Sequence, residues 1–216
     1  MLTNPAQGVV TMHRGLFLAA MAACVVLSAA LGPVRAPAAE TLKPIPAAEA
    51  AKRADETRDF VLDLIAGQID TFWHAGKWAE CVRLLYQRIE LDRHDTDACT
   101  DLGWVLANMN RDAEAVAVFR AGIADNPKNF DIHHHFGLFY HRRHKYDEAI
   151  EQFRIAAKNG APKGWQHMLP GTLEQAGRKQ EALDEWRELL RRFPGDPVAK
   201  QHVQKLEGEM EKGRPA

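Results

Sequence analysis

Histidine is the residue type whose spacing in this sequence comes closest to a chemical site. Five of the ten histidines lie between His133 and His144. Because imidazole binds metal ions and titrates near neutral pH, this cluster could form a metal site or a pH-sensitive surface. His134 and His141 share a helical face but stand about 10 Å apart along the axis, so one ion would need a further ligand such as His167. His141 and His144 could pair, yet no carboxylate or thiol nearby completes a set. We therefore expect a histidine-rich polar surface, with no metal and no cofactor.

No catalytic motif accompanies these histidines. The sequence has no glycine-rich phosphate loop, no HExxH pair, no nucleophile elbow and no metal-binding spacing of paired cysteines. The 28 Lys and Arg residues nearly balance the 29 Asp and Glu residues, and a net charge of -1 gives no electrostatic reason to expect nucleic-acid binding. With 46% apolar and 26% charged residues, the 216-residue chain is also unlike a disordered tail, a fibre or a polytopic membrane protein. We expect neither an enzyme nor a nucleic-acid-binding protein.

Residues 1–39 have the layout of a secretory signal peptide. A basic residue precedes an uncharged apolar stretch over 16–31, and small residues follow it. A membrane-spanning helix usually needs ~20 apolar residues, more than this stretch offers. Counted from Met12, the segment has a length within the usual range of ~15 to 30 residues, so we expect translation to start there. Cleavage after Ala38 or Ala39 would give an exported protein, periplasmic or extracellular; the alternative is an uncleaved segment that tethers the chain to a membrane.

The rest of the chain divides into a linker and one domain. Residues 40–48 carry two prolines and no apolar periodicity, which predicts a linker, and the helical domain is expected over 49–216. Without the signal the chain has 26 basic and 29 acidic residues, a net charge of -3. Its two cysteines, Cys81 and Cys99, could form a disulfide in an oxidising compartment. Because the expected chain reversal near His94 sets them more than a helical turn apart, two buried thiols are favoured, and the pairing stays open.

A repeat of 33 or 34 residues organises this domain and must position the histidines. Four segments align, with first residues Gly76, Asn110, His144 and Gly177. In each segment the second place is basic, the fifth is Glu, the sixth is small, the seventh is aliphatic and the tenth is large and apolar. The sixth-place residues are Cys81, Ala115, Ala149 and Ala182, and the tenth-place residues are Leu85, Phe119, Phe153 and Trp186.

Each of these columns has a physical reason on a helix. The sixth and tenth places share one face, where the small residue lets a neighbouring helix come close. The Glu falls in the first turn, where the helix dipole favours an anion. A second helix precedes each segment; its apolar face is marked by Leu102-Gly103 with Leu106, and again by Phe136-Gly137 with Tyr140. The repeating unit is therefore an antiparallel pair of helices.

This unit resembles the tetratricopeptide repeat (TPR) over about residues 62–197. The resemblance implies an all-α fold, a right-handed superhelical solenoid of about four helix pairs plus a C-terminal capping helix. Pro170-Gly171 falls inside the first helix of the fourth repeat and predicts a late start or a kink there, because proline removes a backbone hydrogen bond. The expected repeats are 62–95, 96–129, 130–162 and 163–197, and the expected capping helix is 198–212.

The concave surface of such a solenoid is its usual binding site. At 100° per residue, the face of each first helix opposite the buried one looks into the groove, and the family resemblance implies the same positions. We expect His133 and His135 to lie off this line, and Trp78, Trp165 and Trp186 to be packing residues. The candidate groove residues are Asp70, Trp73 and His74, then Asp97, Thr100, Trp104 and Asn108, then Asp131, His134, Leu138, His141 and Arg142, with Asp63, His167 and Glu174 as further candidates.

These candidates combine both charges with two tryptophans and one leucine, which suits a peptide or protein segment with apolar anchors. Some TPR proteins clamp a C-terminal carboxylate with Lys and Asn at groove positions where this chain has Thr100, Trp104, His134 and Leu138, so the resemblance does not extend to that subtype. We expect an exported adaptor that holds a protein partner in its groove. A structural role in an envelope assembly, through the convex face or the ends, is the first alternative, and a histidine-based metal-binding protein is the second. Contact with a membrane is expected only through an uncleaved N-terminal segment.

Overall fold

The computed structural model describes residues 45–212, and these form helices without any strand. The expected signal peptide and most of the expected linker lie outside the described residues. The chain divides into two units at Ala50 and Ala51, and the helices from α3 onward belong to the second. The helices are α2 (Ala47–His74), α3 (Trp78–Leu91), α4 (Thr96–Asn108), α5 (Asp112–Asp125), α6 (Phe130–Arg142), α7 (Tyr146–Lys158), α8 (Lys163–Gln166), α9 (Met168–Gln175), α10 (Lys179–Arg192) and α11 (Pro197–Lys212).

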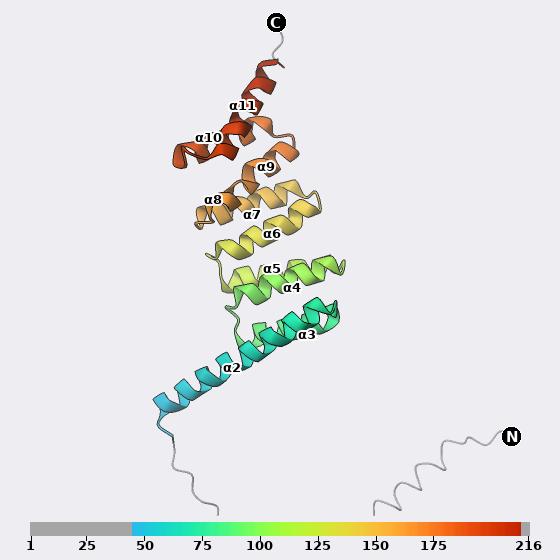
Figure 1. Cartoon of the computed structure of the whole chain (residues 1–216), viewed down its shortest axis with the longest axis vertical. Coiled ribbons are helices and arrows are strands. Elements are labelled where there is room, and N and C mark those ends of the chain that lie inside the picture. Colours follow the sequence, from blue (N-terminus) through green and yellow to red (C-terminus); the bar gives the residue numbers. More distant parts are fainter. Residues whose placement is uncertain (1–44, 213–216) are drawn as a thin grey trace, which may run out of the picture. The chain divides into compact units, whose positions relative to one another are not determined.

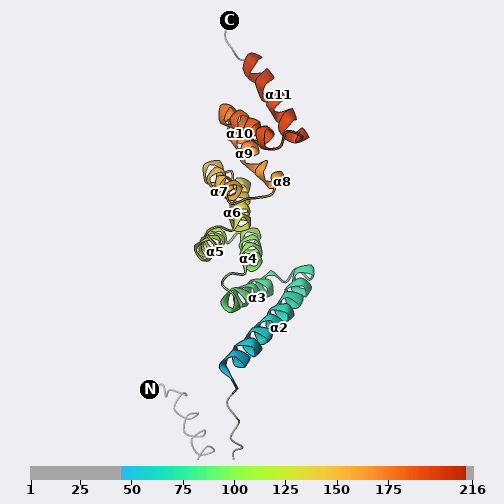
Figure 2. The same cartoon turned by 90° about the vertical axis from the view of Figure 1, so that its left-hand side faces the viewer.

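Within the second unit the helices pair in chain order and the pairs stack (Figures 1 and 2). α4 packs on α5, α6 on α7, and α9 on α10, while α3 contacts α4, α4 contacts α6, and α7 contacts α9 to join one pair to the next. α11 then packs on α10. The predicted fold class, an all-α solenoid of helix pairs with a terminal capping helix, is confirmed. The capping helix begins at Pro197, one residue before its expected start.

The glycines of the Leu-Gly and Phe-Gly steps let the two helices of a pair approach closely. Gly103 of α4 faces the tip of the Phe119 ring so closely that a Cβ atom there would lie 2.4 Å from Cζ. Gly137 of α6 repeats this arrangement with Phe153. Phe119 is fully buried and stacks on Phe136 of the next pair, with ring centroids 5.0 Å apart. The glycines of the Leu-Gly and Phe-Gly steps therefore leave the space that the tenth-place aromatic ring fills.

The first place of every repeat ends the preceding helix in the same way. Gly76, Asn110, His144 and Gly177 all have positive φ, between 57° and 75°. The N–H of the next residue then donates to the carbonyl five residues back, as in Arg111 to Leu106 at 2.9 Å. This left-handed termination is the common C-terminal helix cap, and glycine adopts it without strain.

The fourth repeat carries the irregularity that Pro170-Gly171 predicts. Its first helix is broken at His167 into α8 and α9, and Pro170 lies in the first turn of α9, where its missing N–H costs no helical bond. The His167 ring lies 2.8 Å from the buried Asp196 carboxylate, which also accepts the N–H groups that open α11. Asp196 therefore joins the broken helix to the capping helix.

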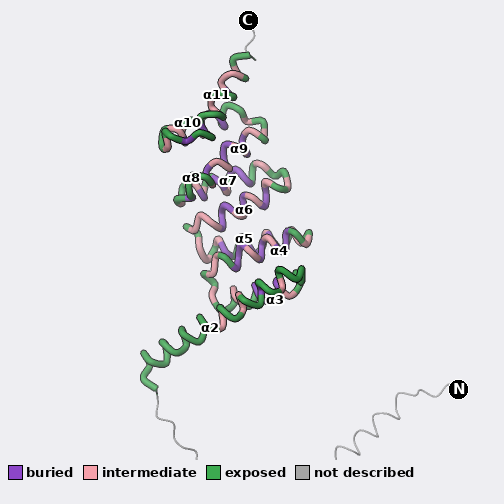
Figure 3. The backbone as a smooth tube through the Cα atoms, viewed as in Figure 1, coloured by how far each residue is buried: buried purple, intermediate pink, exposed green. Residues whose placement is uncertain are grey.

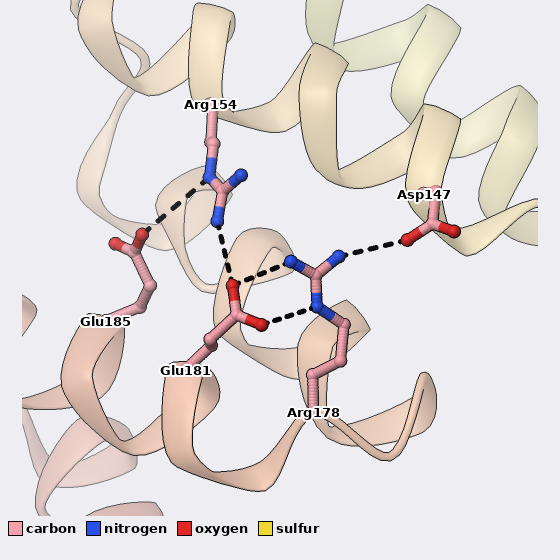
Figure 4. Close-up of polar contacts among 5 residues, drawn as sticks. All are labelled: Asp147, Arg154, Arg178, Glu181 and Glu185. Carbon is pink, nitrogen blue, oxygen red and sulfur yellow. Dashed lines mark hydrogen bonds and ion pairs between the residues drawn. The ribbon is translucent and has the colours of Figure 1, made fainter.

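Ion pairs between repeats add to the apolar stacking (Figure 4). Arg178 donates to Glu181 through Nε and Nη2 at 2.7 Å each, and through Nη1 to Asp147 of α7 at 3.0 Å. Arg154 of α7 also reaches Glu181, at 3.4 Å, and Glu185, at 4.0 Å. The basic second place and the fifth-place Glu thus pair in this repeat, and Arg178 also joins two repeats.

The N-terminal helix is less covered than the others. α2 begins at Ala47, inside the expected linker, and its first half is exposed along its length (Figure 3). Phe60 and Leu64 are 63% and 54% exposed. Within residues 45–212, no helix has the length and apolar character needed to cross a membrane.

Cys81 and Cys99 are separate buried thiols, and burial raises the pKa of each, that of Cys99 to about 11.

Candidate partner-binding groove

A hollow of about 360 Å³ opens between α2 and α4. It brings together the three first-repeat candidates, because Asp70, Trp73 and His74 occupy the last turn of α2. The His74 ring lies 3.4 Å from the Asp70 carboxylate, and both side chains are 75% exposed. We call this feature the α2–α4 hollow; its lining residues are Ala66, Ile69, Asp70, Trp73, His74, Arg88 and Asp101.

Two charged residues of the hollow were not among the sequence candidates. Arg88 of α3 donates to Asp95, the N-cap of α4, at 2.6 Å, so its charge is already paired and holds α3 to α4. Asp101 is half-buried on α4, and among residues 45–212 no Lys or Arg nitrogen lies within 4 Å of it. Burial raises the pKa of Asp101, and the charge of Asp97 raises it further, while Arg88 opposes both. Asp101 therefore lines the hollow without a direct ion pair to Lys or Arg in the described residues, although the charge of Arg88 acts on it.

Trp104 of α4 contacts two side chains of α6, in the third repeat. Its indole N–H donates to His135 Nδ1 at 2.7 Å, and the Arg142 guanidinium lies 4.4 Å from its ring centroid. His135 also approaches Asp131 at 3.5 Å. His135, which we expected to lie off the groove line, reaches back one repeat and contacts Trp104, one of the candidate groove residues.

The other second-repeat candidates differ in their exposure. Asp97 and Asn108 are exposed. Thr100 is buried, and its hydroxyl donates to the Asp97 carbonyl at 3.0 Å, so it presents no side chain for a ligand.

His134 also lies inside the structure rather than on its surface. It is 6% exposed and stacks on Trp165 of α8, with ring centroids 4.2 Å apart. Burial lowers its pKa to about 4, so the ring is neutral at physiological pH. Trp165 packs, as expected, but it packs on His134, which was expected to contact a ligand in the groove. Leu138 is half-buried against the core, and burial also lowers the pKa of the half-buried His141.

The histidine cluster does not converge on one point. His133 lies 2.9 Å from Gln152, His135 accepts from Trp104, and His144 lies 2.8 Å from the Tyr146 hydroxyl. In the described part of the chain, no three His, Cys, Asp or Glu side chains lie close enough together to hold a metal ion.

The fourth-repeat candidates have structural contacts. Glu174 accepts from the Trp186 indole at 2.8 Å and from Lys205 at 2.9 Å, and the His202 ring lies 2.5 Å from it. Glu174 therefore fastens α11 to the stack, as His167 does through Asp196. These two residues were wrongly included among the groove candidates, because the break between α8 and α9 turns them toward the capping helix.

A second hollow, of about 590 Å³, lies away from this face between α5 and α7. Its floor is formed by Phe136 and Tyr140 of α6, and its charged rim includes Glu151 together with Arg120. We call it the α5–α7 hollow. Because it shares no lining residue with the α2–α4 hollow, it offers a matched control surface.

The comparisons with known proteins identify the fold. No protein-family model and no curated protein matches the sequence. Among solved structures, a crystal structure of MamA protein is 13% identical, with a TM-score of 0.54, and the match covers 68% of this chain and 82% of that one. MamA AMB-1 is 23% identical, with a TM-score of 0.51 and coverages of 71% and 84%. PilF of Pseudomonas aeruginosa is 19% identical, with a TM-score of 0.54 and coverages of 74% and 71%. At these identities the likeness shows the fold alone, which is the TPR-type stack of helix pairs.

Proposed function

We propose that this protein is an adaptor that binds a segment of a partner protein along the face formed by α2, α4 and α6. The observation that carries the proposal is the α2–α4 hollow, where an exposed tryptophan stands beside acids on adjacent first helices. Trp73 is 38% exposed, and such amphipathic rings contribute strongly to protein interfaces.

The face continues beyond this hollow. Trp104 and Arg142 form the next side-chain group, on α4 and α6. An extended segment could therefore contact the hollow first and the Trp104 indole next. This arrangement supports binding through several successive helix pairs, as solenoids allow.

We further propose that the adaptor is exported, on the strength of the signal-like layout of residues 1–39. Mass spectrometry of the protein recovered from its host tests this: a chain that begins near residue 39 or 40 supports export with cleavage, whereas an intact N-terminus supports the tether.

Capture of partners from an envelope extract tests the binding face. The full chain, purified as its host processes it, is compared with Trp73→Ala/Trp104→Ala and with the control Arg120→Ala/Glu151→Ala in the α5–α7 hollow. We expect the first variant to lose the proteins that the wild-type chain captures, and the control to retain them. If only the control variant lost the captured proteins, assembly through the other face would be favoured instead. Circular dichroism checks that both variants are folded.

A further inference from the structure

We infer that the α2–α4 hollow receives a lysine or arginine side chain of the partner segment. This inference rests on the proposed function and adds the chemistry of one ligand residue. It follows from the walls of the hollow, from the two aspartates that line it, and from a contact that the chain already makes with itself.

The walls suit a long aliphatic stem. Ala66, Ile69 and Trp73 line the α2 side of the hollow, spaced by three and four residues along one helical face. Lysine and arginine bury their methylene stems against apolar surface while keeping the charged head in a polar setting. A volume of about 360 Å³ leaves room for one such side chain.

The charges in the hollow favour a cation. Asp70 and Asp101 both line it, and among residues 45–212 neither lies within 4 Å of a Lys or Arg nitrogen. The cation that does line it, Arg88, is held by Asp95 at 2.6 Å. His74 is the other basic neighbour, and its ring lies 2.9 Å from the Asp70 carbonyl oxygen and 3.4 Å from the exposed Asp70 carboxylate. A guanidinium or ammonium group in the hollow would therefore meet two carboxylates that no Lys or Arg of the described residues pairs with.

The same face already shows a cation on a tryptophan. Arg142 lies over the Trp104 ring at 4.4 Å, within the range of a cation–π contact. Trp73 has no such cation above it among the described residues; it is 38% exposed, and its ring packs edge-to-face with Trp78, with ring centroids 5.1 Å apart. The α5–α7 hollow differs, because no tryptophan lines it.

Selection from a random library of displayed 12-residue peptides tests the inference on the full chain. Three immobilised proteins are compared: wild type, Asp101→Asn, and Glu151→Gln as the matched control. We expect wild type and Glu151→Gln to enrich peptides with Lys or Arg beside an apolar residue, and Asp101→Asn to lose that preference. In the best synthetic peptide, replacing the basic residue by norleucine should weaken binding to wild type about tenfold and leave binding to Asp101→Asn nearly unchanged.

The outcomes separate this inference from the proposed function. Suppose that wild type enriches peptides and that Trp73→Ala binds them more weakly. If those peptides show no preference for Lys or Arg, the inference is overturned and the adaptor function stands. The same holds if Asp101→Asn keeps the full preference. If no peptide is enriched above an unrelated control protein, the proposed function fails with it.

Discussion

Gly103→Ala should destabilise the protein although alanine is the better helix former. The exchange gains about 1 kcal/mol of helix propensity. The new Cβ would, however, lie 2.4, 2.6 and 2.8 Å from three atoms of the Phe119 ring, whereas carbon atoms pack at about 3.5–4.0 Å. Overpacking of this kind costs roughly 1–3 kcal/mol, and the fully buried ring puts Gly103 near the upper end. We expect a net loss of about 2 kcal/mol, which lowers Tm by roughly 4–8 °C for a domain of this size.

The control is Gly67→Ala, in the exposed part of α2. A Cβ there meets nothing within 4 Å, so the propensity gain stands alone and the variant should be stabilised by up to about 1 kcal/mol. Urea unfolding followed by circular dichroism measures both variants. In Gly103→Ala/Phe119→Ala the steric cost should vanish, which gives a coupling energy of about 1–3 kcal/mol between the two sites. Equal stabilisation by Gly103→Ala and Gly67→Ala would refute the close approach of α4 and α5.

Three further outcomes follow from the contacts. Burial works to raise the pKa of Asp196, but hydrogen bonds from His167 and a backbone N–H lower it below the ordinary 3.8. Its stabilising effect is therefore present above that pH and lost as the pH falls below it, and the Tm gap between wild type and Asp196→Asn should narrow in acid. Arg178→Gln should lower Tm at low ionic strength, and the difference should shrink in about 1 M salt because the ion pairs are exposed. His144→Gly should raise stability by about 0.5–1 kcal/mol in urea unfolding, because histidine there holds a φ of 57° that glycine adopts freely.

The helix pairs could be predicted from the sequence because their columns reflect local physics. The sixth and tenth places, the Leu-Gly step and the first-turn Glu each act within one or two turns of helix. The first place of the repeat carried a signal as well, since Gly76 and Gly177 mark left-handed helix ends. Asn110 and His144 give no such signal in the sequence. Only the backbone shows that they adopt the same left-handed conformation.

The candidate site was harder to predict because it depends on contacts between repeats. Helical spacing alone placed Trp73 and Trp104 on the α2–α4–α6 face. It could not foresee that Trp165 would cover His134, since α8 exists only because the fourth repeat is broken. Asp101 was missed for a related reason. It lines a hollow only because α2 lies beside α4, and helical spacing within α4 alone does not show that neighbour.

Backbone amide shift mapping with a library-selected peptide tests most directly where a partner binds. Spectra of the isotope-labelled full chain are compared with and without the peptide. We expect the largest shift changes in the last two turns of α2 and along α4, with smaller changes near Arg142. Changes concentrated on α5, α7 and α10 would contradict the account, because the partner would then occupy the opposite side of the helix pairs.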